Sequence, residues 1–394
     1  MLQNLTQQPP DKIIEMIGMF RADPRAEKLD LGVGVYKDAE GRTPVMRAVK
    51  AAEARLVEQQ ESKSYVALLG DQGYLDAMQD LVLGDAAPEG RIVGAATPGG
   101  TGAIHQLLEL VKMAKPGATV WYSDPTWPNH PAMVKHMGLG ARTYRYFDDA
   151  TRGVDFDGMM QDLAEVAADD VVILHGCCHN PTGANLSPEQ WDRVTDLLLE
   201  KQAMPFIDFA YQGFGDGLEA DAAAVRKMVG RVPQMLIAAS CSKNFGLYRD
   251  RVGVAFVICA DTETADVTKG VMASINRLNF SFPPDHGAKV VEIILSDPEL
   301  KADWQAELEE MRQRMLQLRT GLAEALRRET NGNDFDFVAE HRGMFSRLGL
   351  PGEQVLRLRD QAGIYMVGDS RVNIAGLPDE GLEGLARAIV STSE

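Results

Sequence analysis

Lys243 is the residue whose surroundings best suit it for covalent chemistry. It follows the apolar run 235–239 and lies in a short segment that contains Ser240, Ser242 and Gly246. An amine at the end of a strand, held between small hydroxyl residues and a glycine, is the arrangement that a Schiff-base lysine needs. The segment also matches the Ser-x-x-Lys pattern of serine acylases, but their companion Lys-Thr-Gly and Ser-Asp-Asn motifs are absent. It therefore favours amine chemistry over acyl transfer.

Asp208 is a carboxylate at the end of another apolar run, 205–208, and Tyr211 follows it three residues later. A buried carboxylate without a partner is costly, so Asp208 requires a positive group. A protonated pyridine nitrogen would meet this need, and the carboxylate would keep that nitrogen protonated. Tyr211 could then donate to an oxygen on the same ring. The alternative is an aspartate that caps a local turn.

A glycine-rich turn at 97–102 precedes the helical pattern 105–111. The first N–H groups of such a helix and its positive dipole end can bind an anion. The turn matches neither a Walker loop nor a Gly-x-Gly-x-x-Gly fingerprint, and it could simply cap the helix. Ser240 and Arg251 are placed in the sequence where they could share a phosphate oxygen with Thr101.

The segment 175–183 follows a further apolar strand and contains Cys177, Cys178 and His179. A zinc site is one interpretation. Adjacent cysteines rarely bind one tetrahedral metal, however, and no second Cys/His pair lies nearby. Buried, reduced cysteines that pack as small apolar groups fit the pattern better. Asn180, which precedes a proline, is expected to present its amide from a rigid turn.

Arg277 and Arg371 are two arginines in polar segments late in the chain. A planar guanidinium binds a carboxylate with two parallel hydrogen bonds, so either residue could hold an acidic substrate group. Either could equally form a surface salt bridge.

Strand-like runs alternate with helical patterns through the middle of the chain, and this indicates a mostly parallel sheet covered by helices on both faces. One such helix is 187–202, where Ser187 is the predicted N-cap and Pro188 the first helical residue. The pattern becomes long, charged and helical from 297 to 329, and a second group of short elements follows 335. The expected strands are 119–122, 171–175, 205–208, 235–239 and 252–259.

Composition excludes several classes of partner. The 394 residues carry a net charge of -17, which disfavours nucleic acid and anionic membrane surfaces. Four unevenly spaced cysteines fit a reducing cytoplasm better than a disulfide framework. Residues 1–10 have neither a basic start nor an apolar core, so we expect no signal peptide, and the longest apolar runs are too short to span a bilayer.

Taken together, these segments resemble the aspartate/aromatic aminotransferase family of class I, which has fold type I and depends on pyridoxal 5'-phosphate. The resemblance runs over essentially the whole chain. It implies an α/β fold in which residues 44–311 form a large domain around a mostly parallel, seven-stranded sheet. Residues 1–43 would form an N-terminal arm and part of a small domain, and residues 312–394 the small α/β domain itself. The segments that carry the resemblance are 31–38, 97–102, 124–130, 175–183, 208–214, 240–248 and 371–376.

The resemblance implies a role for each residue near the cofactor ring. Lys243 holds pyridoxal phosphate as a Schiff base and moves the proton between the substrate α-carbon and the cofactor. Asp208 binds the pyridinium, and His130 orients Asp208. Asn180 and Tyr211 hydrogen-bond the phenolic oxygen. Trp127 stacks on the ring, and both Trp127 and Asn180 also contact substrate.

It likewise implies how the phosphate and the substrate are held. The phosphate is bound by Gly100, Thr101, Ser240 and Arg251, together with Tyr65, which reaches across from the other subunit and also serves catalysis. Arg371 binds the substrate α-carboxylate with help from the Gly34 backbone. Arg277 reaches across the dimer to the distal carboxylate of a dicarboxylic substrate. The site is therefore shared within a homodimer, and the reaction is ping-pong between amino acids and 2-oxo acids.

Substrate preference is the harder question. Val35, Lys37, Thr43 and Thr101 resemble the aspartate-specific branch of the family, whereas Ser64 and Phe282 make the mouth of the pocket less polar. The segments 280–284, 340–346 and 365–371 resemble bacterial aromatic amino acid aminotransferases. We therefore expect an enzyme for aromatic amino acids (Phe, Tyr, Trp) that also accepts aspartate and glutamate, with 2-oxoglutarate as an acceptor.

Two rivals remain open. One is a strict aspartate aminotransferase. The other is a regulatory or scaffold protein that binds the cofactor without turnover, although the intact set of Lys243, Asp208 and Arg371 argues against it. For the dual enzyme, one hypothesis is that Arg277 swings out to solvent when an aromatic ring enters, because an unpaired guanidinium buried against the ring would be costly.

Overall fold

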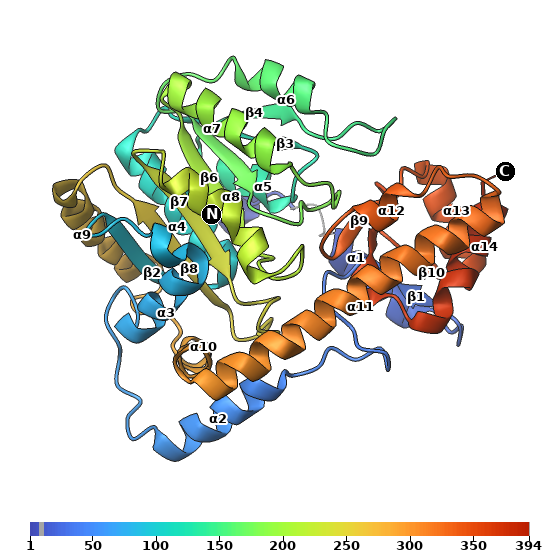
Figure 1. Cartoon of the computed structure of the whole chain (residues 1–394), viewed down its shortest axis with the longest axis horizontal. Helices are drawn as coiled ribbons and strands as arrows, with labels where there is room; N and C mark the ends of the chain where they lie inside the picture. The colour runs from blue at the N-terminus through green and yellow to red at the C-terminus, as the bar shows by residue number, and fades with distance from the viewer. Residues whose placement is uncertain (8–11, 394) are drawn as a thin grey trace. The chain divides into compact units, whose positions relative to one another are not determined.

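The computed structural model describes residues 1–7 and 12–393 (Figure 1). The prediction that residues 1–10 form no signal peptide includes residues 8–10, which lie outside the described residues. Contacts divide the chain into two compact units. The large unit comprises Pro44–Asn180 and Ala184–Arg314, and the small unit comprises Met1–Thr43, Pro181–Gly183 and Met315–Glu394.

The large unit is built on a seven-stranded sheet with the strand order β2-β8-β7-β6-β5-β3-β4. β8 runs antiparallel to its neighbours β2 and β7, and the remaining pairs are parallel. Every residue of β5, β7 and β8 is buried, as expected for strands covered on both faces. The predicted α/β fold with a mostly parallel, seven-stranded sheet is confirmed. The strands are β2 (Ile92–Pro98), β3 (Thr119–Asp124), β4 (Gly140–Arg145), β5 (Val171–His175), β6 (Met204–Phe209), β7 (Met235–Ser240) and β8 (Val252–Ile258).

Helices lie on both sides of this sheet (Figure 1). α4 (Gly99–Ala114), α5 (Asn129–Met137) and α9 (Thr262–Asn279) pack their apolar residues on one face, in a cluster that includes Ile173 and Phe206 of the strands. α7 (Pro188–Lys201) begins as predicted, with a capping box between Ser187 and Gln190. The other helices of this unit are α2 (Arg47–Gln59), α3 (Gln72–Leu83), α6 (Phe156–Leu163), α8 (Leu218–Val229) and α10 (His286–Ser296), with the 3-10 helix η2 (Gly84–Ala86).

The small unit joins the two ends of the sequence. β1 (Leu29–Asp30) pairs in parallel with β10 (Ile364–Tyr365), and β9 (Phe345–Arg347) pairs antiparallel with β11 (Arg371–Asn373). Leu31 packs into the same apolar core as residues near the C-terminus. The remaining elements are α1 (Lys12–Ala22), α12 (Phe337–Glu340), α13 (Gly352–Ala362), α14 (Leu382–Ser391) and the 3-10 helices η1 (Leu2–Asn4), η3 (Ile374–Gly376) and η4 (Asp379–Gly381).

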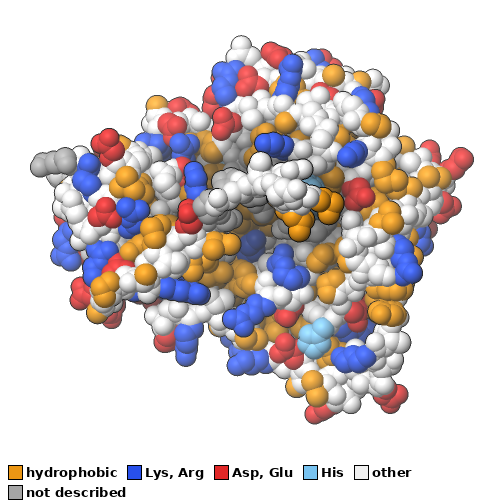
Figure 2. All heavy atoms as spheres, turned by 180° about the vertical axis from the view of Figure 1, so that it is seen from behind, with side chains coloured by type: hydrophobic (Ala, Val, Ile, Leu, Met, Phe, Trp, Pro, Cys, Tyr) orange, Lys and Arg blue, Asp and Glu red, His pale blue; other side chains and the backbone are white. Residues whose placement is uncertain are grey.

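α11 (Pro298–Thr330) is one long helix with residues in both units, and it matches the predicted helical stretch 297–329. Its C-terminal half contributes Leu318, Leu322 and Leu326 to the small-unit core. Within the described part of the chain, none of the helices combines the length and the apolar character that crossing a membrane requires. On the face drawn in Figure 2, Lys and Arg side chains alternate with acidic and apolar ones instead of forming one basic surface.

Candidate active site

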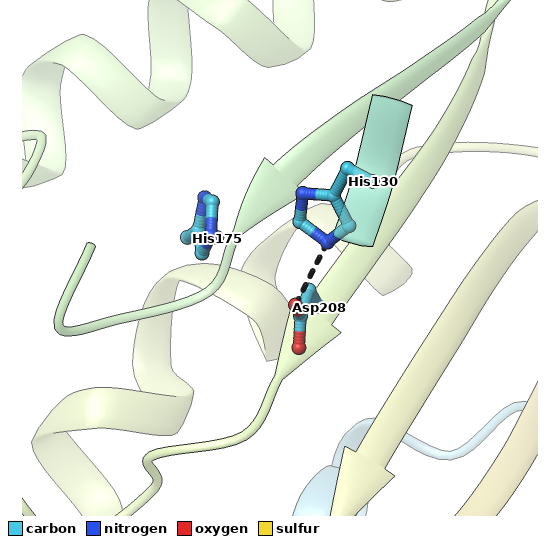
Figure 3. A group of neighbouring side chains, drawn as sticks. All are labelled: His130, His175 and Asp208. Atoms are coloured by element: carbon cyan, nitrogen blue, oxygen red, sulfur yellow. Dashed lines mark hydrogen bonds and ion pairs between the residues drawn. The ribbon is translucent and has the colours of Figure 1, made fainter. Parts of the chain in front are cut away.

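Asp208 lies near the carboxyl end of β6, in register with His175 of β5 and Ala238 of β7. Its Oδ2 accepts a hydrogen bond from Nε2 of His130, at 3.0 Å, and both side chains are buried (Figure 3). The other ring nitrogen of His130 lies 2.9 Å from Oγ1 of Thr126, in the loop that precedes α5. The structure thus places His130 where the sequence predicted it, fixed by Thr126 on one side and bonded to Asp208 on the other.

The pKa of Asp208 lies below its ordinary value. Burial alone would raise it, and the hydrogen bond from His130 is the largest of the effects that outweigh burial. An ionised carboxylate at the end of a parallel strand is suited to hold a cation such as a protonated pyridine nitrogen.

His175 is a residue to which the sequence analysis gave no role. Its ring centroid lies 5.2 Å from that of His130, and its ring nitrogens have no hydrogen-bond partner among the described residues. Burial lowers its pKa to about 3, so it packs beside Asp208 as a neutral ring. The available signal was its position at the end of the strand next to the one that carries Asp208.

Lys243 follows β7, with its Nζ 4.9 Å from the ring centroid of Tyr211. Burial lowers the pKa of this amine, and Asp208 opposes the shift while the charge of Arg251 adds to it. Nδ2 of Asn180 donates to the hydroxyl of Tyr211 at 3.5 Å. The structure therefore brings Lys243, Tyr211 and Asn180 to the same edge of the sheet as Asp208, and the lowered pKa favours the neutral, nucleophilic amine.

The N-terminus of α4 forms a cradle of donors. Its N-cap residue is Pro98, whose side chain makes no capping hydrogen bond. The first N–H groups of a helix have no partner within the helix and can bind a ligand. A Cβ added to Gly99, whose φ is +75°, would lie 2.5 Å from Nη2 of Arg251, and one added to Gly100 would lie 3.0 Å from Cβ of Ser240. The positive φ favours glycine at 99, and a side chain at either position would displace Arg251 or crowd Ser240. Thr101, Ser240 and Arg251 lie around the helix end as the sequence predicted, and this set fits a phosphate group.

Trp127 lies in the connection between β3 and α5. Its ring meets that of His130 edge to face, with centroids 5.3 Å apart. It is therefore part of the same group of side chains as Asp208.

Tyr65 and Arg277 form a second group. Tyr65 is 82% exposed and stacks on Phe282 with ring centroids 4.6 Å apart. The guanidinium of Arg277 lies 5.7 Å from the same Phe282 ring, and its Nη1 donates to Oγ of Ser281 at 2.5 Å. Tyr65 and Arg277 thus both lie against Phe282 at the surface of the large unit.

Arg371 and Gly34 belong to the small unit. Arg371 is only 5% exposed, which excludes the surface salt bridge considered from the sequence. Its Nη2 donates to the carbonyl of Gly32 at 2.8 Å, and its guanidinium lies 4.5 Å from the centroid of Phe345. A Cβ added to Gly34 would lie 2.9 Å from Cζ of the same ring, so the Phe345 ring packs against both predicted residues.

Several backbones next to predicted site residues adopt the left-handed conformation that non-glycine residues avoid. The φ angles are +52° at Cys178, +57° at Arg251, +68° at Ser281 and +63° at Ser370. Ser281 accepts the hydrogen bond from Arg277, and Ser370 directly precedes Arg371. Strain of this kind concentrates at functional sites.

The cysteine cluster has a structural explanation. Ligand atoms of Cys177, Cys178 and Asp221 lie within 4.8 Å of one another. Burial raises the pKa of Cys177 well above its usual range, which disfavours the thiolate that zinc binds. The Asp221 carboxylate accepts three backbone N–H groups of the loop 213–216. Nε2 of His179 lies 3.0 Å from Oγ of Ser123. These contacts favour packed thiols over a zinc site.

Lys243 should make the stability of the cofactor-free chain depend on pH. Its folded pKa lies below its ordinary value of 10.5, so between those two values the unfolded chain binds more protons. Unfolding free energy should therefore rise with pH in that window. We expect Lys243→Met to unfold at higher urea than the parent at pH 7, with the difference shrinking as the pH approaches 10.5. Lys227→Met, at a surface lysine, is the control; a gap that does not vary with pH would contradict the expectation.

Comparison with known proteins agrees with this geometry. The model of the family "Aminotransferase class I and II" matches residues 26–389. The chain is 57% identical over 390 residues to an aromatic-amino-acid aminotransferase of Paracoccus denitrificans, covering 99% of both chains. It is 42% identical over 394 residues to an aspartate aminotransferase of Escherichia coli strain K12, covering 99% of this chain and 100% of the other.

Solved structures are similar over the full length. An aromatic amino acid aminotransferase with 3-indolebutyric acid has a TM-score of 0.98 at 56% identity, with 100% of both chains covered. An aromatic-amino-acid aminotransferase from Burkholderia pseudomallei, covalently bound to pyridoxal phosphate, has a TM-score of 0.98 at 39% identity, again with 100% of both chains covered.

Proposed function

This chain belongs to the class I and II aminotransferase family, and from that premise we propose which of its residues carry out the reaction. The protein is a pyridoxal-phosphate-dependent aminotransferase that acts on aromatic and dicarboxylic amino acids. The main support for the assignment is the position of Lys243, a buried amine with a lowered pKa near the hydrogen-bonded pair of His130 and Asp208.

The cofactor ring would be held by residues from four neighbouring segments of the large unit. When bound, pyridoxal phosphate supplies an electron-withdrawing ring that stabilises negative charge on the substrate α-carbon. Asp208 keeps the pyridine nitrogen protonated, because the lowered pKa keeps this carboxylate charged. Lys243 would hold the cofactor through its aldehyde carbon and would carry the proton at the substrate α-carbon. Asn180 and Tyr211 would donate hydrogen bonds to the phenolic oxygen, and Trp127 would pack on the ring.

The phosphate fits the donor cradle at the start of α4. Gly100 and Thr101 offer backbone N–H groups at the positive end of the helix, and Ser240 and Arg251 add a hydroxyl and a guanidinium. Tyr65 of the partner subunit completes the set and also acts in catalysis.

Two arginines select the substrate. Arg371, buried beside Gly34, binds the α-carboxylate that every amino acid carries. Arg277 binds the distal carboxylate of aspartate or glutamate in the neighbouring subunit's site. Each can form two parallel hydrogen bonds to a carboxylate, which fixes its orientation.

We propose that the protein works as a homodimer with shared sites. Tyr65 and Arg277 are at the surface of their own chain, and exposed apolar side chains lie on the same unit at Val267, 64% exposed, and Leu278, 78% exposed. A hollow of about 670 Å³ in the same unit is lined by residues 66–72 and by residues of α9 between 266 and 273. A second copy of the chain would cover this apolar area. Sedimentation as a monomer at micromolar concentration would contradict the dimer.

Domain roles and compartment are further proposals. Residues 44–311 are the cofactor-binding domain, with 1–43 and 312–394 forming the arm and the small domain; the two compact units support this division. Among the described residues the four cysteines are buried and none forms a disulfide, which supports a reducing cytoplasm. Recovery of the protein from a secreted or periplasmic fraction would contradict that location.

Substrate preference is tested most directly at Arg277. Phenylalanine and aspartate, added separately to the cofactor-loaded protein, should each change its visible absorbance in a single turnover. Conversion by aspartate alone would favour the strict aspartate enzyme, and conversion by neither would favour a non-catalytic cofactor-binding protein. In Arg277→Ala, kcat/KM for aspartate should fall by about 10²–10³-fold because a charged, bidentate contact is lost. The value for phenylalanine should change by less than about threefold.

The matched control for that variant is Arg142→Ala, at an exposed arginine of the same unit that pairs with Glu165. It should leave both substrates unaffected. Equal losses for aspartate and phenylalanine in Arg277→Ala would remove Arg277 from its proposed role.

A further inference from the structure

Asn276 is a fully buried amide that directly precedes the exposed Arg277 in the last turn of α9. Its Nδ2 donates to the carbonyl of Leu68 at 2.9 Å and lies 3.3 Å from the carbonyl of Ala96. Its Oδ1 accepts from Nε2 of Gln106 at 2.7 Å. One side chain therefore ties the end of α9 to three other points of the large unit.

Each of these points belongs to a segment that carries a proposed site residue. Leu68 lies three residues after Tyr65, Ala96 lies in β2 just before the phosphate turn 97–102, and Gln106 lies on α4, which begins at that turn. Asn276 is thus connected both to the residues offered to the partner subunit and to the phosphate cradle of its own chain.

The segment that follows Tyr65 is also held closely to β2. The backbone N–H of Ala96 donates to the carbonyl of Leu69 at 2.7 Å. A Cβ on Gly70, whose φ is +103°, would lie 2.5 Å from Cβ of Ala96, so the contact requires glycine. Because this packing is tight, a shift of the Asn276 side chain would also displace the 65–70 segment.

The buried hydrogen bonds of Asn276 fix the position of the C-terminal end of α9. Without the amide of Asn276, the carbonyls of Leu68 and Ala96 and the N–H of Gln106 would lose a partner inside the protein, and the end of α9 would shift to let them find another. Arg277 is the next residue on that helix, so its guanidinium would move with it. A shift of about 1 Å is enough to cost a large factor in a reaction that depends on orientation.

We propose that Asn276 is a positioning residue for substrate selection. It holds Arg277 and Tyr65 in fixed relation to the phosphate turn, and the neighbouring site thereby receives a guanidinium at the place that a dicarboxylate needs. This rests on the proposed function, in which Arg277 binds the distal carboxylate. Aromatic substrates do not use Arg277, so they share only the smaller part of the effect that reaches the site through Tyr65.

The test measures kcat and KM of the holoenzyme for aspartate and phenylalanine. For Asn276→Ala we expect the aspartate-to-phenylalanine ratio of kcat/KM to fall by about tenfold, mainly through the KM for aspartate. Gln106→Leu keeps both donations from Asn276 and is the milder variant should Asn276→Ala fold poorly; its ratio should fall by about threefold. Tyr144→Phe is the control, since it removes a buried 2.7 Å hydrogen bond to the Ile173 carbonyl and should leave the ratio unchanged.

A double-mutant comparison separates positioning from general damage. If Asn276 acts through Arg277, then Asn276→Ala should not change the ratio further in the Arg277→Ala background. An equal loss for both substrates, or the same fall in ratio in that background, would overturn the inference. If Arg277→Ala itself leaves the ratio unchanged, the proposed role of Arg277 fails; if it changes the ratio and Asn276→Ala does not, only the present inference fails.

Discussion

Lys243→Ala is expected to lower kcat by more than about 10⁴-fold for every substrate, because we propose that the same amine both binds the cofactor and moves the proton. Among the described residues, the nearby Asp208 is a carboxyl group with a lowered pKa and Tyr211 is a phenol, and neither can replace an amine. The variant should also lose covalent attachment of the cofactor. After borohydride reduction and digestion, the parent should yield a modified peptide that contains position 243, and the variant should not.

Lys227→Ala is the control, at a lysine that pairs with Asp192 on the surface. It should retain full activity and the same modified peptide. If Lys243→Ala kept a covalently attached cofactor, the assignment of the reactive lysine would be wrong.

Asp208→Asn should produce the second largest loss, about 10²–10³-fold in kcat, because an amide cannot keep a pyridine nitrogen protonated as a carboxylate does. The amide keeps nearly the same shape, so the loss reports charge and not packing. Asp208→Glu retains the charge in a displaced position and should recover part of the activity. Steady-state rates for both variants, measured at saturating cofactor, test the expectation.

The control for this pair is Asp170→Asn, another buried aspartate, whose Oδ2 accepts from Nε1 of Trp121 at 3.0 Å. It should destabilise the protein without a comparable fall in kcat. Similar losses at both positions would mean that the effect of Asp208→Asn is a general result of burying an amide.

Apolar runs were sufficient to predict the central strands but not the outer ones. β5, β6, β7 and β8 lie on the predicted runs because strands buried on both faces have nearly continuous apolar sequences. β2 was not predicted, since its Gly94, Ala95 and Ala96 are too small to give a strand-like pattern. β4 was not predicted either, because it is an edge strand with mostly exposed side chains.

The candidate site could be predicted where polar residues follow strands, because the carboxyl ends of neighbouring parallel strands meet at one edge of the sheet. This is how Asp208 and Lys243 were identified. His175 and Asn276 were missed for another reason: their roles arise from burial and from contacts between distant segments. Asn276 makes its three hydrogen bonds to residues 170 to 208 positions away, which no local pattern indicates.

The left-handed residues beside the site also bear on attempts to make the protein more heat-resistant. Each such backbone costs on the order of 1 kcal/mol or more, which glycine would not incur. Glycine at Ser281 would relieve this cost but would remove the hydroxyl that accepts from Arg277. At Ser370 the buried hydroxyl accepts the backbone N–H groups of Gly349 and Leu350, so glycine there would remove that acceptor. A gain in thermal stability at Ser281 would thus loosen an arginine that we propose to recognise substrate.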